Sequence, residues 1–380
     1  MAIYLDNNAS TALDPAVLEA MLPYLAEHHG NPSSIHSSGR IARTAIDSAR
    51  EQVADLVGAH PTQLIFTSGG TEANNLALNV LASHEMATFC VSAVEHPAVL
   101  EPARYWQARG WQLELLPVDD EGLIDRTLAN NILQRQPVMM SVMMANNETG
   151  VIQPLQSLAQ NAREYGVIVH TDAVQAAGKI VVDFNASGAH LMSLSSHKIY
   201  GPKGVGALVI DKALDIPPLL LGGGHEKGWR SGTENVSAIV GFAKAAELAK
   251  QQLGQRSDHM RELRDRLENA LKTIDGVHII AESAPRLPNT TLIAIPGIEG
   301  ETLLMSLDAK GIAVSSGSAC ASTDTEPSHV LRAMRLDDEL AQSTVRISFG
   351  KDSTVAECDA LLLAIRELTQ MSQQMASVAW

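Results

Sequence analysis

Short apolar runs alternate with longer amphipathic stretches through the first two-thirds of the chain. The apolar runs predict strands at 63–68, 88–94, 112–118, 137–144, 167–173, 190–196 and 205–210. Most of the segments between them carry apolar residues at helical spacing, as at 72–82 and 154–165. Apolar strands separated by helices are typical of a mostly parallel sheet covered on both faces. This part is therefore predicted to be an α/β domain.

The last third of the chain has a different pattern. An amphipathic helix at about 257–274 precedes short strands at 290–296, 311–316 and 345–350, and a terminal helix follows. This order indicates a smaller α+β domain. Because 380 residues exceed what one hydrophobic core usually holds, two domains are expected. We predict a large domain at 15–254 and a small domain formed by 1–14 together with 255–380.

Charge and cysteine content restrict the class of protein. The formal net charge of −15 argues against direct binding to nucleic acid or to an anionic membrane. The first residues show no signal peptide, and no apolar run is long enough to span a bilayer. Three scattered cysteines do not make a disulfide framework. We therefore expect a cytoplasmic protein.

Small and polar residues follow the predicted strands where ligands of parallel sheets bind, beyond the carboxyl ends. After the first strand, Gly69, Gly70 and Thr71 lead into a helix, which suits a phosphate group. An ordinary capped helix start is the alternative. The sequence lacks the Gly-Lys-Ser/Thr of a Walker loop.

Three further strand ends carry polar side chains. His96 follows the second strand and is either a functional group or a structural histidine. Asn147 follows the fourth strand in a segment that also reads as a turn. Asp172 ends a buried strand, where a carboxylate needs a partner, either a cationic ring nitrogen or a nearby arginine.

The sixth strand ends in Ser195, His197 and Lys198. A lysine that loses water at a strand end can act as an amine nucleophile, although it can also simply reach solvent. Lys203 lies in a Gly-Pro turn and is expected to be solvated. Taken together, a phosphate cradle, a histidine, a buried aspartate with Gln175 nearby and a lysine are the groups that hold pyridoxal phosphate.

Cys320 lies in the segment SSGSACAST, among glycine, alanine and hydroxyl side chains. Cys90 and Cys358 lie in apolar strand and helix patterns and are predicted to be structural. Cys320 instead lies in a segment whose small and hydroxyl side chains predict an exposed loop.

Ten ordered motifs along nearly the whole chain make it resemble a cysteine desulfurase of the NifS/IscS family, in the class-V aminotransferases. They are YLDNNAST, GNPSSIHSSGR, FTSGGTEANN, EHPAVL, NNETGVIQP, HTDAVQAAGK, SSHKIYGPKGVGAL, RSGTEN, SSGSACAS and VRISFG. The resemblance implies the aspartate-aminotransferase-like fold of pyridoxal-phosphate enzymes, fold type I. The segment around Cys320 resembles the long-loop group of the family.

The resemblance also implies a role for each residue of the site. Lys198 would bind the cofactor as a Schiff base, His96 would stack on its ring and carry protons, and Cys320 would accept sulfur. The remaining roles are the cofactor phosphate for Gly70, Thr71, Ser195 and His197, the ring nitrogen for Asp172, the ring oxygen for Gln175, and the substrate carboxylate for Asn147 and Arg346. Thr233 would reach the phosphate of the neighbouring subunit in a homodimer.

The implied reaction converts L-cysteine to L-alanine and leaves a persulfide on Cys320 for an acceptor protein. The acceptor stays open between an iron–sulfur scaffold, a thiolation relay and a dedicated modification partner, because the chain ends at MSQQMASVAW without the extension of housekeeping members. No metal site is expected, apart from Cys320 as a transient iron–sulfur ligand with a scaffold. The alternatives are a selenocysteine lyase, an aminotransferase of the same fold and a non-catalytic scaffold.

Overall fold

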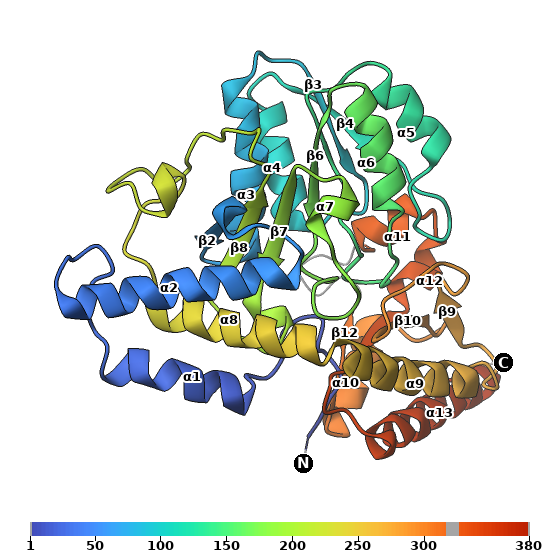
Figure 1. Cartoon of the computed structure of the whole chain (residues 1–380). Coiled ribbons are helices and arrows are strands. Elements are labelled where there is room, and N and C mark those ends of the chain that lie inside the picture. The colour runs from blue at the N-terminus through green and yellow to red at the C-terminus, as the bar shows by residue number, and fades with distance from the viewer. Residues whose placement is uncertain (1, 317–326, 379–380) are drawn as a thin grey trace.

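The computed structural model describes residues 2–316 and 327–378. Within these residues, one large sheet forms the centre of the molecule (Figure 1). Its strands lie in the order β2 (Leu64–Thr67), β8 (Gly206–Ile210), β7 (Leu191–Ser195), β6 (Ile168–Asp172), β5 (Met139–Ser141), β3 (Thr88–Ser92) and β4 (Gln112–Leu116).

Most neighbouring strands of the large sheet run parallel. The pairs β7–β6, β6–β5, β5–β3 and β3–β4 are parallel, whereas β8 is antiparallel to both β2 and β7. Every residue of β2, β6, β7 and β8 is buried, as expected for strands covered on both faces. The prediction of a mostly parallel α/β sheet is confirmed.

Helices cover the large sheet on both faces and bury two separate apolar cores. One core joins the sheet to α3 (Gly70–Leu78) and α4 (Pro97–Gln107). The other joins it to α2 (Ser37–Leu56), α5 (Arg126–Leu133), α6 (Leu155–Glu164), α7 (Phe184–Ser187) and α8 (Val236–Gln251). Helix α1 (Pro15–Ala26) packs against α8. The short 3-10 helices are η1 (Pro61–Gln63), η2 (Asn79–Ser83), η3 (Ser196–Lys198) and η4 (Glu226–Gly228).

A smaller antiparallel sheet comes from the last third of the chain. Its order is β12 (Ser315–Ser316), β13 (Thr344–Ser348), β10 (Thr290–Ala294) and β9 (His278–Ile280). It shares a third apolar core with α9 (Leu253–Leu271), α10 (Gly300–Ala309) and α13 (Val355–Val378). Helices α11 (His329–Ala333) and α12 (Asp338–Gln342) lie beside it (Figure 1). The helix expected from residue 257 begins earlier, at Leu253.

The first residues of the chain pack beside strands from its last third. Strand β1 (Ile3–Tyr4) pairs in parallel with β11 (Ile312–Ala313), and Asp6 forms an isolated bridge with Ser348 of β13. The chain then crosses towards the large sheet, where the Thr11 amide donates to the carbonyl oxygen of His197. Residues 6–11 therefore connect the two sheets.

The segment 217–234, which contains Thr233, is held in place by one buried and one half-buried ion pair. Arg50 of α2 binds Glu226 through two guanidinium nitrogens, each at 2.7 Å, and the Phe66 amide donates to the same carboxylate at 2.9 Å. Arg230 binds Glu72 of α3 at 2.9 Å. These contacts tie the segment to α2, to β2 and to the start of α3.

Glu226→Gln should lower the free energy of unfolding by about 3–5 kcal/mol, because it leaves the buried Arg50 guanidinium without a counter-ion. The control is Glu367→Gln at the exposed pair Lys310–Glu367, which should cost less than about 1 kcal/mol. Urea denaturation of both variants measures the difference. Equal losses would contradict the assigned role of the Arg50–Glu226 pair.

Candidate active site

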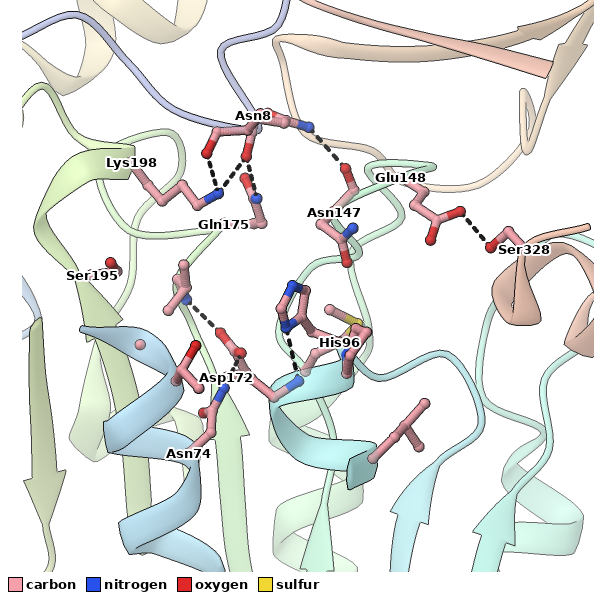
Figure 2. Close-up of a pocket in the computed structure, with 18 of the residues that line it drawn as sticks. Asn8, Asn74, His96, Asn147, Glu148, Asp172, Gln175, Ser195, Lys198 and Ser328 are labelled. Carbon is pink, nitrogen blue, oxygen red and sulfur yellow. Dashed lines mark hydrogen bonds between the residues drawn. The ribbon is translucent and has the colours of Figure 1, made fainter. Parts of the chain in front are cut away.

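A cavity of about 860 Å³ lies at the carboxyl ends of β3, β6 and β7 (Figure 2). Both sheets contribute to its walls, because Asp172 and Ser195 come from the large sheet and Ser315 and Arg346 from the small one. Its position agrees with the rule that parallel sheets bind ligands beyond the carboxyl ends of their strands.

The N-terminus of α3 forms one wall and can receive an anion. Gly69 is the N-cap and supplies no side-chain hydrogen bond, so the first amide N–H groups of α3 are not consumed by a cap. The hydroxyl of Ser195 is buried beside it and has no hydrogen-bond partner. A Cβ atom on Gly206 would lie 2.6 Å from the Gly69 carbonyl carbon, so only glycine lets β8 approach this loop.

Asp172 is a buried carboxylate without a cationic partner among the ion pairs of residues 2–316 and 327–378. Its oxygens accept hydrogen bonds from Asn74 Nδ2 at 2.7 Å and from the Val174 amide at 2.9 Å. The arginine partner that the sequence left open is not found in the described structure, and the carboxylate can bind a cation from the cavity.

Lys198 lies in η3, directly after β7, and extends along the opposite wall (Figure 2). Its Nζ donates to the carbonyl oxygens of Asn8 at 2.6 Å and Ala9 at 2.8 Å. Lys198 is half-buried, whereas Lys203 is exposed and does not line the cavity. The choice of Lys198 over Lys203 as the amine of the site fits this geometry.

Gln175 and Lys179 continue the same network behind the cavity wall. Gln175 Nε2 donates to the Asn8 carbonyl oxygen at 2.9 Å, and Lys179 Nζ donates to Gln175 Oε1 at 2.7 Å. Burial lowers the pKa of Lys179 well below its usual range, and the charges of Lys198 and Arg346 act in the same direction. Asn8 is therefore the centre of the polar contacts on this side.

His96 is the N-cap of α4 and faces the cavity. Its Nδ1 accepts a hydrogen bond from the Ala98 amide at 3.0 Å, which leaves Nε2 as the nitrogen that can carry a proton towards the cavity. Burial lowers the pKa of His96, although the nearby Asp172 carboxylate opposes this effect. Burial also lowers the pKa of His197, to about 4, so both rings favour the neutral form at pH 7.

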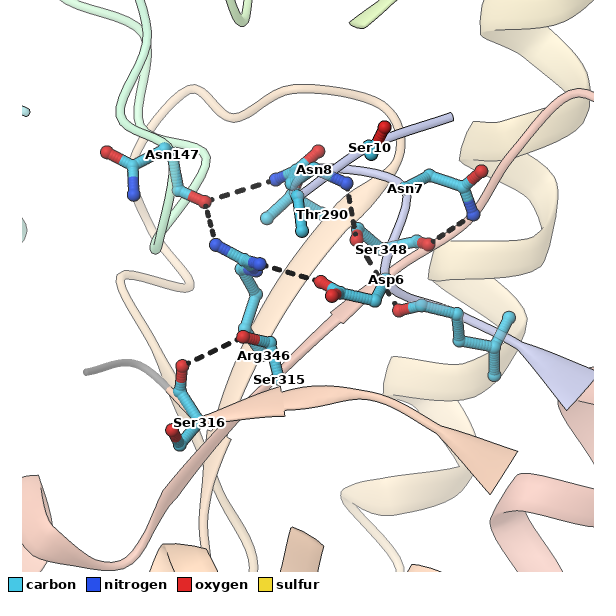
Figure 3. A network of polar contacts seen from close by, with 12 residues as sticks. Asp6, Asn7, Asn8, Ser10, Asn147, Thr290, Ser315, Ser316, Arg346 and Ser348 are labelled. Atoms are coloured by element: carbon cyan, nitrogen blue, oxygen red, sulfur yellow. Dashed lines mark hydrogen bonds and ion pairs between the residues drawn. The ribbon is translucent and has the colours of Figure 1, made fainter. Parts of the chain in front are cut away.

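Arg346 enters the cavity from β13 of the small sheet (Figure 3). It pairs with Asp6 at 2.7 Å and donates to the backbone carbonyl oxygen of Asn147 at 3.0 Å. The guanidinium Nε is buried and has no partner. Asn147 thus contacts Arg346 through its main chain, and its side chain also lines the cavity.

Glu148 is a buried carboxyl group on the wall that carries α11. Ser328, the N-cap of α11, donates to Glu148 Oε2 at 2.7 Å. Burial raises the pKa of Glu148 to about 7, although the Ser328 hydrogen bond and the charge of Arg346 act against burial. Glu148 therefore changes its charge near neutral pH.

The cavity brings together most of the residues singled out from the sequence. Those that line it are Gly70, Thr71, His96, Asn147, Asp172, Gln175, Ser195, His197, Lys198 and Arg346. Thr233 is exposed and does not line the cavity of its own chain. Cys320 lies outside the described residues. Cys90 is buried in an apolar core, as predicted, and Cys358, for which either packing or a helix surface was expected, is also buried in one.

Sequence reasoning missed four polar residues of the site: Asn8, Asn74, Lys179 and Glu148. Asn8 and Asn74 each stand in an Asn-Asn pair, and Glu148 follows another such pair. Lys179 closes the motif that contains Asp172 and Gln175, four residues after Gln175. All four residues lie in motifs that the sequence analysis had already quoted. Their place in those motifs was the signal that could have identified them as site residues.

Comparison with known proteins establishes the family of the chain. Residues 3–361 match the family described as aminotransferase class-V. The cysteine desulfurase IscS of Dictyoglomus turgidum is 43% identical over 372 residues, which cover 97% of this chain and 94% of that protein. The chain belongs to the NifS/IscS cysteine desulfurases, within the class-V aminotransferase family.

Two further relatives of this cysteine desulfurase cover almost its whole length. NifS of Azotobacter vinelandii is 42% identical over 381 residues, with 99% of this chain and 94% of that protein covered. A solved structure of a NifS-like protein superimposes with a TM-score of 0.92 at 38% identity, and covers 98% of this chain and 100% of its own. The predicted family, fold type I and pyridoxal-phosphate cofactor are confirmed.

The described residues show neither a metal-binding cluster nor a membrane-spanning helix. Residues 2–316 and 327–378 contain no group of three or more His, Cys, Asp or Glu side chains placed to hold a metal ion. None of the helices in these ranges has the length and apolar character needed to cross a membrane.

The raised pKa of Glu148 predicts a pH-dependent stability. A carboxyl group whose pKa is raised in the folded state destabilises the fold as the pH rises. For Glu148 this loss begins near the pKa of the unfolded state and extends through about pH 7. Glu148→Gln removes this penalty, so its free energy of unfolding relative to wild type should rise by up to about 3 kcal/mol between pH 5 and pH 8.

Urea denaturation at several pH values measures this difference for Glu148→Gln. Ser328→Ala removes the hydrogen bond that lowers the pKa of Glu148, so the pKa should rise further. The decline in stability of that variant should therefore extend to a higher pH than in wild type. A difference between Glu148→Gln and wild type that stays constant from pH 5 to pH 8 would show that Glu148 does not titrate there.

Proposed function

We propose that this cysteine desulfurase binds pyridoxal phosphate through Lys198 and uses Cys320 to take sulfur from L-cysteine. The overall change is L-cysteine plus the Cys320 thiol giving L-alanine plus a Cys320 persulfide. The Cys320 sulfur bonds to the substrate sulfur, the carbon–sulfur bond of the substrate breaks, and a proton replaces sulfur on that carbon.

The residues around the cavity support pyridoxal phosphate as their ligand. The unpartnered Ser195 hydroxyl and the uncapped start of α3 at Gly70 and Thr71 suit a phosphate. The Asp172 carboxylate suits a protonated ring nitrogen, and the Lys198 amine suits a carbonyl group. When bound, the cofactor supplies a sink for the electrons that the substrate α-carbon releases.

The chain's own groups then divide the work of binding and proton transfer. The Lys198 amine, once it is not bonded to the cofactor, can hold the α-proton of the substrate. His96 could hold or give a proton at Nε2 on the cavity side, because its Nδ1 already accepts from the Ala98 amide. Arg346 lies ready for the substrate carboxylate, with Asp6 and Asn147 fixing the guanidinium on its other side.

One observation carries the role of Cys320: the residues on both sides of segment 317–326 line the cavity. Ser315 of β12 contributes on one side, and Pro327 and Ser328 on the other. Cys320 follows Ser316 by only four positions in the sequence. This supports a thiol that reaches the cavity, in the manner of the long-loop group.

We further propose a homodimer that completes the site. Thr233 is exposed and lies in segment 217–234, which also exposes Leu219, Leu220 and Leu221. An apolar exposed segment next to the start of α3 supports contact with a second subunit, whose phosphate Thr233 would reach. The large and small domains would divide at about residue 254, in the first turn of α9.

The persulfide would pass to an acceptor protein, either an iron–sulfur scaffold, on which Cys320 would act as a transient cluster ligand, or a thiolation relay. Such a thiol needs a reducing compartment, and we place the protein in the cytoplasm. Cys90 and Cys358, both free thiols, support that setting.

Cys320→Ala should lower alanine formation from L-cysteine by more than about 100-fold, because the variant lacks the nucleophile that takes the sulfur. The visible absorbance of the bound cofactor and its change on adding L-cysteine should persist. Cys358→Ala, at a buried thiol remote from the cavity, is the matched control and should keep its activity.

Selenocysteine separates the desulfurase from a lyase in the same assay. Selenium leaves carbon more readily than sulfur does, so Cys320→Ala should retain substantial alanine formation from selenocysteine. Undiminished turnover of L-cysteine by Cys320→Ala would contradict the proposed role of the thiol and favour the lyase.

A further inference from the structure

Lys179 is a buried amine that neither the family roles nor the proposed reaction uses. Only 5% of its surface is exposed, and it does not line the cavity. Within residues 2–316 and 327–378, no carboxylate lies within ion-pair distance of its Nζ. Its two hydrogen bonds go to Gln175 Oε1 at 2.7 Å and Asn8 Oδ1 at 3.0 Å. A buried amine without a counter-ion is costly and calls for a reason.

Both acceptors of Lys179 are side-chain amides, whose two ends are similar in shape but opposite in hydrogen bonding. An amine that donates to Gln175 Oε1 makes the amide place its Nε2 on the other side. That Nε2 donates one hydrogen to the Asn8 carbonyl oxygen at 2.9 Å. The second hydrogen of the NH₂ group is left for the cavity, which Gln175 lines.

The same amine fixes the Asn8 side chain. Asn8 Oδ1 accepts from Lys179 and from Asn289 Nδ2 at 2.9 Å, so Asn8 Nδ2 points the other way and donates to Thr290 Oγ1 at 2.9 Å. Lys179 thus fixes the side chain of Asn8. The carbonyl oxygen of Asn8 in turn accepts from Gln175 Nε2 and from Lys198 Nζ, as Figure 2 shows.

We propose that Lys179 is a positioning residue that keeps the N–H end of Gln175 directed at the ring oxygen of the cofactor. The inference rests on the proposed place of Gln175 beside that oxygen. An N–H donor stabilises negative charge on the ring oxygen, whereas the carbonyl end of the amide would repel it. Without Lys179 the amide is able to turn over, and the ring oxygen loses its donor for part of the time.

The positioning does not depend on the charge of Lys179. A protonated amine has three hydrogens and a neutral amine has two, and the two acceptors need one each. The geometry of the two amides therefore carries the proposal, and it holds in either protonation state.

The test compares holoenzymes by the visible absorbance maximum of the bound cofactor and the pH midpoint of that band. The variants are Lys179→Met, Gln175→Ala and the double variant, with Lys203→Met as a control that removes an exposed lysine. Gln175→Ala should shift both quantities. Lys179→Met should shift them in the same direction, and the double variant should shift them no further than Gln175→Ala does. Lys203→Met should match wild type.

A structural role alone would lower the thermal stability of Lys179→Met and leave its absorbance unchanged, which would overturn the proposal. Fully additive shifts in the double variant would also overturn it, because they would show that Lys179 does not act through Gln175. An unshifted Gln175→Ala enzyme would instead contradict the proposed place of Gln175, which keeps the two failures distinct.

Gln175→Glu gives a second test that leaves Lys179 in place, in case Lys179→Met does not fold. The carboxylate can keep the contact with Lys179 but presents an oxygen to the cavity. The absorbance should therefore shift at least as far as in Gln175→Ala. A spectrum like that of wild type would show that residue 175 does not donate to the ring oxygen, and would overturn the proposal.

Discussion

The carbonyl oxygen of Asn8 is the contact on which the arrangement of the site depends. It accepts from Lys198 Nζ and Gln175 Nε2, which lie in the segments that follow the neighbouring strands β7 and β6. The side chain of the same residue bonds to Thr290 in the small sheet and to the Asn147 carbonyl oxygen (Figure 3). A segment near the start of the chain thereby joins both sheets at the cavity and sets the position of the lysine amine.

Two charged groups of this cavity, Arg346 and Asp172, differ in the partners that hold them. Arg346 is balanced on one side by Asp6, and Asp172 is held by neutral donors from Asn74 and Val174. An arginine with one side already paired can still receive a carboxylate on the other, and a carboxylate bound only by neutral donors can still receive a cation. The site is thus complementary to a ligand that carries charges of both signs.

The sequence predicts most of the fold but only part of the polar network around the cavity. Strand and helix positions follow from apolar periodicity, which decides which face is buried, and the positions of Asp172 and Lys198 follow from strand ends in a parallel sheet. The reversal of β8 was not predictable in this way, because an apolar run has the same pattern in either direction. The network of Asn8 and Lys179 was also missed, since it depends on contacts between residues more than 160 positions apart, such as Lys179 with Asn8.

Covalent labelling of the lysine tests the central claim most directly. The loaded enzyme is treated with borohydride, which makes the bond between cofactor and protein permanent, then digested and mapped by mass spectrometry. The account predicts the pyridoxyl label on the peptide that contains Lys198, in a yield close to one per chain. A label on Lys179 or Lys203, with Lys198 unmodified, would contradict the account.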